Sequence, residues 1–157
     1  NSIHTISIGV AREKDFDLHL EAVSLLSESD KYIPKILNNL KKESIDSLGL
    51  EWYKSWDKNL PNWKNTPGGI NIPVLIWLSN LIDSFDLEEF AKSRYQLLGN
   101  GSHWFPGNNV NLLDVNVFEN QLLKVLEGHI KPKKVIKKLR VLKEKFGGKS
   151  ISRLSKN

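Results

Sequence analysis

The chain has 157 residues and a formal net charge of +5, with 39% hydrophobic and 26% charged residues, which excludes collagen-like, low-complexity and wholly disordered chains. The absence of cysteine excludes disulfides, thiolate nucleophiles and cysteine-ligated metal sites. No apolar segment approaches the roughly 18 residues that a membrane span needs. We therefore expect one globular domain over residues 1–148 without membrane contact, and a basic, flexible tail over 149–157.

The N-terminal segment has the alternating pattern of a β-strand. Ile6, Ile8 and Val10 alternate with small or polar residues, which is typical of a strand with one buried face. Apolar residues at 16, 18 and 20 also alternate, so a hairpin is one interpretation. Helical spacing from Leu18 onward supports the other, a strand that leads into a helix, and we favour it.

Two helices are predicted next. The first follows Ser29 and Asp30, which can cap a helix, and has an apolar stripe at positions 33, 36, 37 and 40. The second follows Ser44 and has apolar residues at spacings of three and four up to Trp56, with Gly49 as a weak point. Prolines and glycines then fill residues 59–72, which predicts a loop and a candidate subdomain boundary.

The central core helix is predicted over residues 74–85, where nearly every position is apolar. Asp86 and Glu89 have the spacing of a capping box and predict a further helix that Gly99 ends. A helical pattern also covers residues 115–126. These elements predict a mainly helical α+β fold, a compact domain of about five or six helices with a short N-terminal strand or hairpin.

Charge is divided unevenly along the chain. Through Ile130 there are 12 Lys and Arg against 17 Asp and Glu, and from Lys131 onward there are 11 against Glu144 alone. The last helix, which Pro132 opens, has apolar residues on one side and basic residues over the remainder. This asymmetry is typical of a chain that binds a polyanion or an acidic protein surface. Pairing between the basic segment and the chain's own acidic body is the alternative.

The last helix and the tail are therefore our candidate phosphate-binding surface. Its residues are Lys133, Lys134, Lys137, Lys138, Arg140, Lys143, Lys145, Lys149 and Arg153. The basic cluster from Lys131 to Lys138 also resembles a nuclear localisation signal, which favours an intracellular, nuclear location. Binding to a membrane surface is disfavoured, because the apolar side of this helix lacks tryptophan.

Aromatic residues in two loops are candidate protein-binding residues. Three of the five tryptophans lie on predicted helices, where core packing is expected. Trp63 and Trp104, the latter followed by Phe105, lie instead in loops that contain proline and glycine. Exposed aromatic rings can seat a protein partner or stack on bases. The alternative is that each ring pins its own loop to the body of the protein.

Catalytic patterns are sparse. The four histidines lack the spacing of metal ligands. Asp86, Glu88, Glu89 and Lys92 loosely resemble the carboxylates and lysine of a metal-dependent nuclease, but the predicted capping box already accounts for two of them. We therefore predict no catalytic residue, no bound metal and no cofactor.

One short motif resembles a known enzyme family. Residues 94–100, with the sequence RYQLLGN, resemble the closing motif of the cytosine-C5 methyltransferases. Those enzymes also need a catalytic cysteine and a glycine-rich cofactor loop, and this sequence has neither. The resemblance therefore implies no methyltransferase activity and assigns no family.

The leading functional hypothesis is a non-enzymatic binding module of a nucleic-acid-associated assembly such as chromatin. In this hypothesis the acidic body contacts protein and the basic last helix contacts phosphates. The alternative is a pure protein–protein interaction domain that uses the aromatic loops, and the third is a small metal-dependent nuclease. The sequence leaves open the choice between DNA and RNA, the identity of the partner and the oligomeric state.

Overall fold

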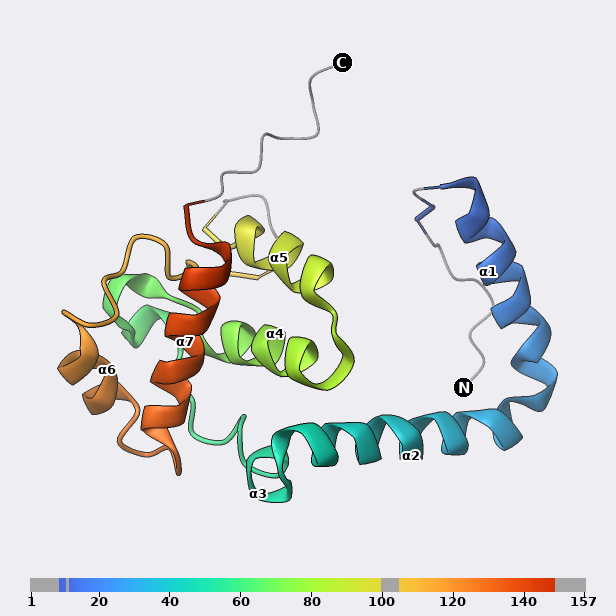
Figure 1. Cartoon of the computed structure of the whole chain (residues 1–157), viewed down its shortest axis with the longest axis horizontal. Coiled ribbons are helices and arrows are strands. Elements are labelled where there is room, and N and C mark those ends of the chain that lie inside the picture. The colour runs from blue at the N-terminus through green and yellow to red at the C-terminus, as the bar shows by residue number, and fades with distance from the viewer. Residues whose placement is uncertain (1–8, 11, 100–104, 149–157) are drawn as a thin grey trace, which may run out of the picture. The chain divides into compact units, whose positions relative to one another are not determined.

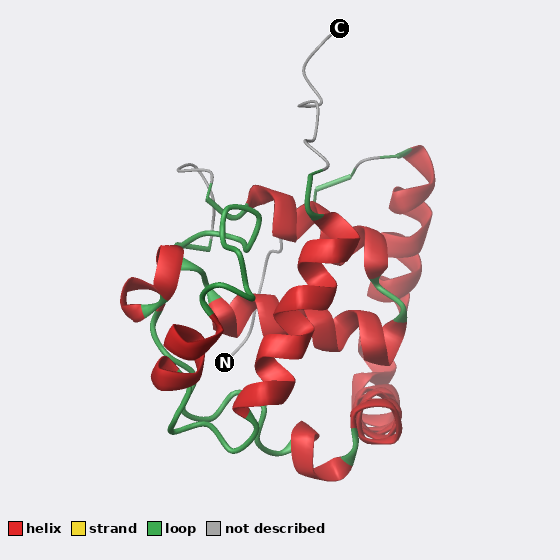
Figure 2. Cartoon of the chain, turned by 60° about the vertical axis from the view of Figure 1, so that its left-hand side comes forward, coloured by secondary structure: helices red, strands yellow, loops and turns green. Residues whose placement is uncertain are grey.

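The computed structural model describes residues 9–10, 12–99 and 105–148, and the chain divides into two compact units, Asn1–Lys42 and Glu43–Asn157. The described residues are mainly helical, as the sequence predicted, and contain no strand (Figures 1 and 2). Their β pairing is limited to an isolated parallel bridge between Ile70 and Asn108. None of the described helices is long and apolar enough to cross a membrane.

Helices α1 (Glu13–Ser24) and α2 (Ser29–Leu48) bury no side chain, and α2 continues from the first unit into the second. A 3₁₀ turn spans Leu25–Glu28 between them, and none of its residues is buried. Residues 16–20 are helical, so the hairpin interpretation is wrong, because these backbone groups bond within α1 instead of across a ladder. The predicted strand lies mostly outside the described residues, and its described end, Gly9 and Val10, is in neither helix nor strand.

The second helix, which was predicted to begin after Ser44, is a continuation of α2. The backbone runs through Ser44 without interruption and α2 ends at Leu48. Gly49 then takes a left-handed φ of 80°, which glycine adopts without steric cost, and the short helix α3 follows over Leu50–Tyr53. The predicted break at Ser44 is therefore wrong, and the real break is at the glycine.

The core of the second unit forms around α4, which spans Ile72–Phe85. The side chain of Asn71 caps α4 by accepting a hydrogen bond from the Val74 backbone at 3.1 Å. Helix α4 packs against α5 (Glu88–Leu97) and α7 (Pro132–Phe146), and α6 (Glu119–Val125) packs against α7 (Figure 1). The apolar α4 is therefore the central core helix, as its composition predicted.

The predicted capping box at Asp86 and Glu89 is wrong. Asp86 takes a left-handed φ of 54° and ends α4, with its backbone N–H donating to the Ile82 carbonyl at 3.0 Å. Helix α5 begins one residue later than expected, after Leu87, and has no side-chain cap. The reason is that Asp tolerates the left-handed conformation that the turn between α4 and α5 requires.

Asparagine side chains tie two loops of the second unit together. The 59–72 loop, where the sequence placed a candidate subdomain boundary, lies inside this unit. Asn71 donates to the Pro106 carbonyl at 2.7 Å, and Asn108 donates to the Gly68 carbonyl at 2.9 Å. Because these amides satisfy backbone carbonyls that no regular structure pairs, both loops can lie against the core.

Candidate binding surfaces

Helix α7 positions the basic residues that the sequence singled out. Its apolar side docks on the core, and five of its side chains are only 0–1% exposed: Val135, Ile136, Leu139, Leu142 and Phe146. Pro132 occupies the first turn of α7, where its missing N–H costs no hydrogen bond. The amphipathic pattern therefore predicted both the helix and its buried side correctly.

Lys138 lies inside the protein, although the sequence placed it among the outward-facing cations. Its ammonium group donates to the Asp83 carboxylate at 2.5 Å and to the Ser79 hydroxyl at 3.1 Å, and both partners are on α4. The residue is 7% exposed. Buried charges are retained where a partner compensates them, so this ammonium group already has its counter-ion.

Other cations of the segment that begins at Lys131 also pair with carboxylates of the same unit. Three ion pairs join it to α3, α6 and α5: Lys131 with Glu51, Arg140 with Glu119 and Lys145 with Glu88. The pairs formed by Arg140 and Lys145 have N–O distances of 2.5 Å. The acidic body and the basic helix thus neutralise each other in part, which is the alternative that the sequence left open.

Lys134 is held over the ring of a buried tryptophan. Its Nζ lies 4.5 Å from the centroid of the Trp52 ring, a cation–π geometry. Trp52 is 1% exposed and its indole N–H donates to Asn80 at 2.9 Å. Partial burial, and then the neighbouring charges of Lys138 and Lys131, lower the pKa of Lys134. This side chain therefore packs against the protein and does not extend freely into solvent.

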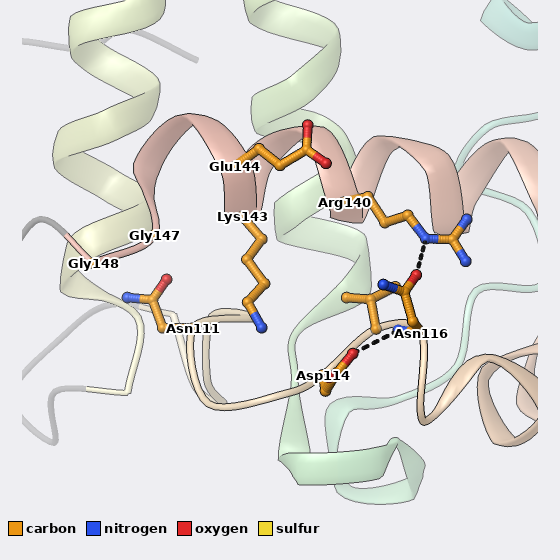
Figure 3. A pocket seen from close by; sticks show the side chains of 9 residues that line it. Asn111, Asp114, Asn116, Arg140, Lys143, Glu144, Gly147 and Gly148 are labelled. Atoms are coloured by element: carbon orange, nitrogen blue, oxygen red, sulfur yellow. Dashed lines mark hydrogen bonds between the residues drawn. The ribbon is translucent and has the colours of Figure 1, made fainter.

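A cavity of about 450 Å³ lies beside the C-terminal part of α7 (Figure 3). Arg140 and Lys143 line it together with the carboxylates of Asp114 and Glu144, so its wall carries both signs of charge. Lys143 donates to the Leu113 carbonyl at 2.7 Å, and Arg140 is paired as described above. Both cations have partners within the protein itself, so the cavity presents no free cation that would select an anionic ligand.

Two basic residues of α7 remain exposed and have no partner among the described residues, namely Lys133 and Lys137. They are one helical turn apart and therefore neighbours on the helix surface. Lys149 and Arg153 lie outside the described residues. The phosphate-binding surface that the sequence predicted is thus reduced, where the structure describes it, to this pair and to side chains that already have intramolecular partners.

The described aromatic candidates pack against their own chain. Trp63 is half-buried, and its Cβ and ring lie so close to Gly107 that an added Cβ there would be 2.9–3.0 Å from them. The ring of Phe105 is half-buried 5.9 Å from that of Trp77. Trp104 lies outside the described residues. Trp63 and Phe105 therefore fit the alternative in which each ring pins its loop to the body.

The carboxylates considered for a nuclease do not converge. Glu88 pairs with Lys145, Glu89 pairs with Lys92, and Asp86 closes the turn after α4. Among the described residues, no group of three or more His, Asp and Glu side chains is placed to hold a metal ion.

The surface that the sequence analysis missed is an apolar stripe on α2, formed by Ile33, Ile36, Leu37 and Leu40 and called here the α2 stripe. These side chains are 51%, 52%, 60% and 43% exposed. Their spacing was recognised, but only as evidence for a helix. A unit of about 40 residues rarely buries a core of its own, and the bounds of this unit are known from the structure and not from the sequence.

The described residues of the motif that resembles the methyltransferase segment have structural roles. Tyr95 is fully buried and its hydroxyl donates to Asn111 at 2.6 Å, and burial raises the pKa of this hydroxyl. Gly99 has a left-handed φ of 88° just after α5 ends. The described residues of this motif thus terminate α5 and anchor a neighbouring loop.

Comparisons of the chain with protein-family models, with curated proteins and with solved structures find no match.

Proposed function

We propose that the chain is a non-enzymatic protein-interaction module that binds its partner through the apolar side chains of its first unit. Ten large apolar side chains between Phe16 and Leu40 are 42–65% exposed, and no residue of α1, the 3₁₀ turn or α2 is buried. Large apolar surfaces that stay exposed in a folded protein are typical of binding sites. This exposure is the observation that carries the proposal.

The energetics of a single helix point the same way. Most of the stability of a helix in a protein comes from the packing of its apolar face and not from helix propensity. Fully burying one Ile or Leu side chain stabilises by about 1.5–3 kcal/mol, so covering the α2 stripe would contribute several kcal/mol. An apolar helix face seated on a complementary protein surface is a common mode of recognition.

The first unit has no net charge, and it is therefore better suited to bind an apolar protein surface than a polyanion. Residues 1–42 contain 6 Lys and Arg against 6 Asp and Glu, so this unit is neutral. Binding to a nucleic acid depends on an excess of positive charge, and the first unit has none. The aromatic loops are the weaker candidates for the contact, because their described rings pack against the second unit itself.

The proposal is tested by site-specific photo-crosslinking in cells that produce the full chain. p-Benzoylphenylalanine replaces Tyr32, which lies at the edge of the α2 stripe, and in a matched control it replaces Asn38 on the opposite side of α2. We expect irradiation to yield a covalent complex with a protein from position 32 and much less from position 38. The additional substitution Leu37→Asp should abolish the product. Equal yields from the two positions would overturn the proposal.

One observation favours a second candidate, the module of a nucleic-acid-associated assembly. Lys133 and Lys137 are exposed side by side, and neither has a partner in the part of the chain that the structure describes. A nuclear location, which the basic cluster suggested, would accompany this function. Two phosphate contacts give a slope of about −2 for log K against log salt on duplex DNA. Fluorescence titration with duplex DNA at two salt concentrations tests this, with Lys133→Gln and Lys137→Gln combined as the variant. Binding that salt or the variant leaves unchanged removes the candidate.

A further inference from the structure

We infer that the partner of the α2 stripe is a second copy of this chain, so that two chains associate through antiparallel α2 helices. The inference rests on the proposed function and names the partner for the same surface. It follows from the arrangement of apolar and charged residues around α2.

The α2 stripe is narrow, continuous and suited to helix–helix packing. At 100° per residue its four side chains fall within an arc of about 100°, over roughly two helical turns. A stripe of this width is the pattern by which one helix packs against another. Because all four members are branched aliphatic residues, the stripe can interdigitate with an identical stripe.

An antiparallel arrangement makes the stripe complementary to itself. A two-fold axis between Ile36 and Leu37 places Ile33 of one copy opposite Leu40 of the other. The same symmetry repeats every contact, as it does in a closed two-fold dimer. Such a pairing covers the four exposed side chains of both copies without needing any other surface.

Charges at one edge of the stripe also favour the antiparallel arrangement. Asp30 and Lys41 are eleven residues apart, about three helical turns, and so lie along the same edge. Both are exposed and have no ion-pair partner among the described residues. In an antiparallel pair this edge meets its own copy, so Asp30 of each chain approaches Lys41 of the other, and two ion pairs form.

Sedimentation of the full chain over a range of concentrations tests the association. We expect the mass to rise from one chain to two, with dissociation in the micromolar range. Ile36→Asp places a carboxylate in both halves of the interface and should raise the Kd at least about a hundredfold. Asn38→Asp adds the same charge on the opposite side of α2 and should leave the Kd unchanged.

Folding of the variants can be followed independently, because all five tryptophans lie in residues 43–157. Unchanged tryptophan fluorescence shows that Ile36→Asp has not unfolded the second unit. An unmodified chain that stays monomeric at every concentration overturns the inference. The same holds if Ile36→Asp and Asn38→Asp give equal Kd values.

Charge exchange tests the orientation. Asp30→Lys and Lys41→Asp each place like charges opposite one another in the antiparallel dimer, so each variant alone should dimerise several-fold more weakly. An equimolar mixture of the two variants restores both ion pairs in the mixed dimer and should recover the original affinity. If mixing gives no recovery while the unmodified chain dimerises, the antiparallel arrangement is wrong.

The outcomes also separate this inference from the proposed function. A monomeric chain that photo-crosslinks from position 32 to a different protein overturns the second copy as partner and leaves the proposed function standing. A monomeric chain that crosslinks only within itself, or not at all, overturns both.

Discussion

Helices α2 and α7 have the same kind of sequence and opposite environments. Both have apolar residues at spacings of three and four with charged residues on the remaining surface. The five apolar side chains on the docked side of α7 are 0–1% exposed, whereas those of the α2 stripe are 43–60% exposed. An amphipathic pattern therefore predicts that one face of a helix is buried against another surface. It does not predict which element, or which chain, provides that surface.

The ion pairs of the two units differ in the same way. In the second unit Lys138 pairs with Asp83 and Arg140 with Glu119, residues that lie far apart in the sequence. The pairs described for the first unit, such as Lys31 with Glu28, join residues only three positions apart. Tertiary packing has therefore brought together several ion pairs of the second unit, whereas the pairs described for the first unit join neighbours along the sequence.

Truncation of one apolar residue in each helix should give the largest contrast. Leu139→Ala removes a fully buried side chain of α7 and should lower the free energy of unfolding of the second unit by about 2–5 kcal/mol. Ile36→Ala removes a half-exposed side chain of α2 and should change it by less than about 0.5 kcal/mol. Urea unfolding at concentrations too low for self-association measures both effects. Tryptophan fluorescence follows the second unit, which holds all five tryptophans, and far-ultraviolet circular dichroism follows the helices of both units.

A large loss from Ile36→Ala under these dilute conditions would contradict the comparison. It would mean that the α2 stripe is covered within the monomer and is not a free surface. A small loss from Leu139→Ala would mean instead that α7 contributes little to the core.

A methyl group added to glycine should give the second contrast. Gly107 has a φ of 85°, and an added Cβ would lie 3.0 Å from the Gly69 carbonyl oxygen as well as close to Trp63. Gly107→Ala should therefore destabilise the second unit by about 2–3 kcal/mol through strain and displaced backbone. Gly9, in the first unit, has nothing within 4 Å of such a Cβ, so Gly9→Ala should have no measurable effect.

The same unfolding experiment compares the two glycine variants. Equal stability of Gly107→Ala and the unmodified chain would show that Trp63 and the loop around Gly69 move aside at no cost. That result would remove the argument that Trp63 is fixed against its own protein.

Patterns that depend on neighbouring residues predicted much of the fold. The apolar run over residues 74–85 and the stripe of α7 predicted α4 and α7 because dense or periodic apolar residues need burial whatever surrounds them. The turn at Asp86 was not predicted, because capping-box spacing and a left-handed helix end compete for the same residues. Ser44 was misread for a similar reason, since serine caps helices but is also tolerated within them.

The binding surfaces were harder to predict because they depend on contacts between distant residues. The sequence shows that Lys138 and Asp83 have opposite charges, but only the packing of α7 on α4 brings them together. Nothing in the sequence pattern distinguishes Lys133 and Lys137 from Lys138, yet Lys133 and Lys137 remain exposed. The exposure of the α2 stripe was equally hidden, because helical periodicity is identical for a face that binds its own core and a face that binds another chain.

Removal of one ammonium group in each unit should give the smallest contrast. Lys138→Met keeps an unbranched side chain but removes the ammonium group, which donates to Asp83 and Ser79 and lies 5.7 Å from the centroid of the Trp52 ring. Because Asp83 is 47% exposed, water compensates part of the loss, and we expect a destabilisation of about 1–2 kcal/mol. Lys31→Met breaks an exposed pair with Glu28 and should change stability by less than about 0.5 kcal/mol.

A double-mutant cycle separates the charge interaction from the packing of the lysine stem. Asp83→Asn combined with Lys138→Met should cost less than the sum of the two single substitutions, because the second change no longer breaks a pair. Lys31→Met with Glu28→Gln should be additive, since water already screens both groups. If the Lys138 cycle is also additive, its ion pair contributes no more than the local pairs of the first unit, and packing on α4 would be what keeps Lys138 from solvent.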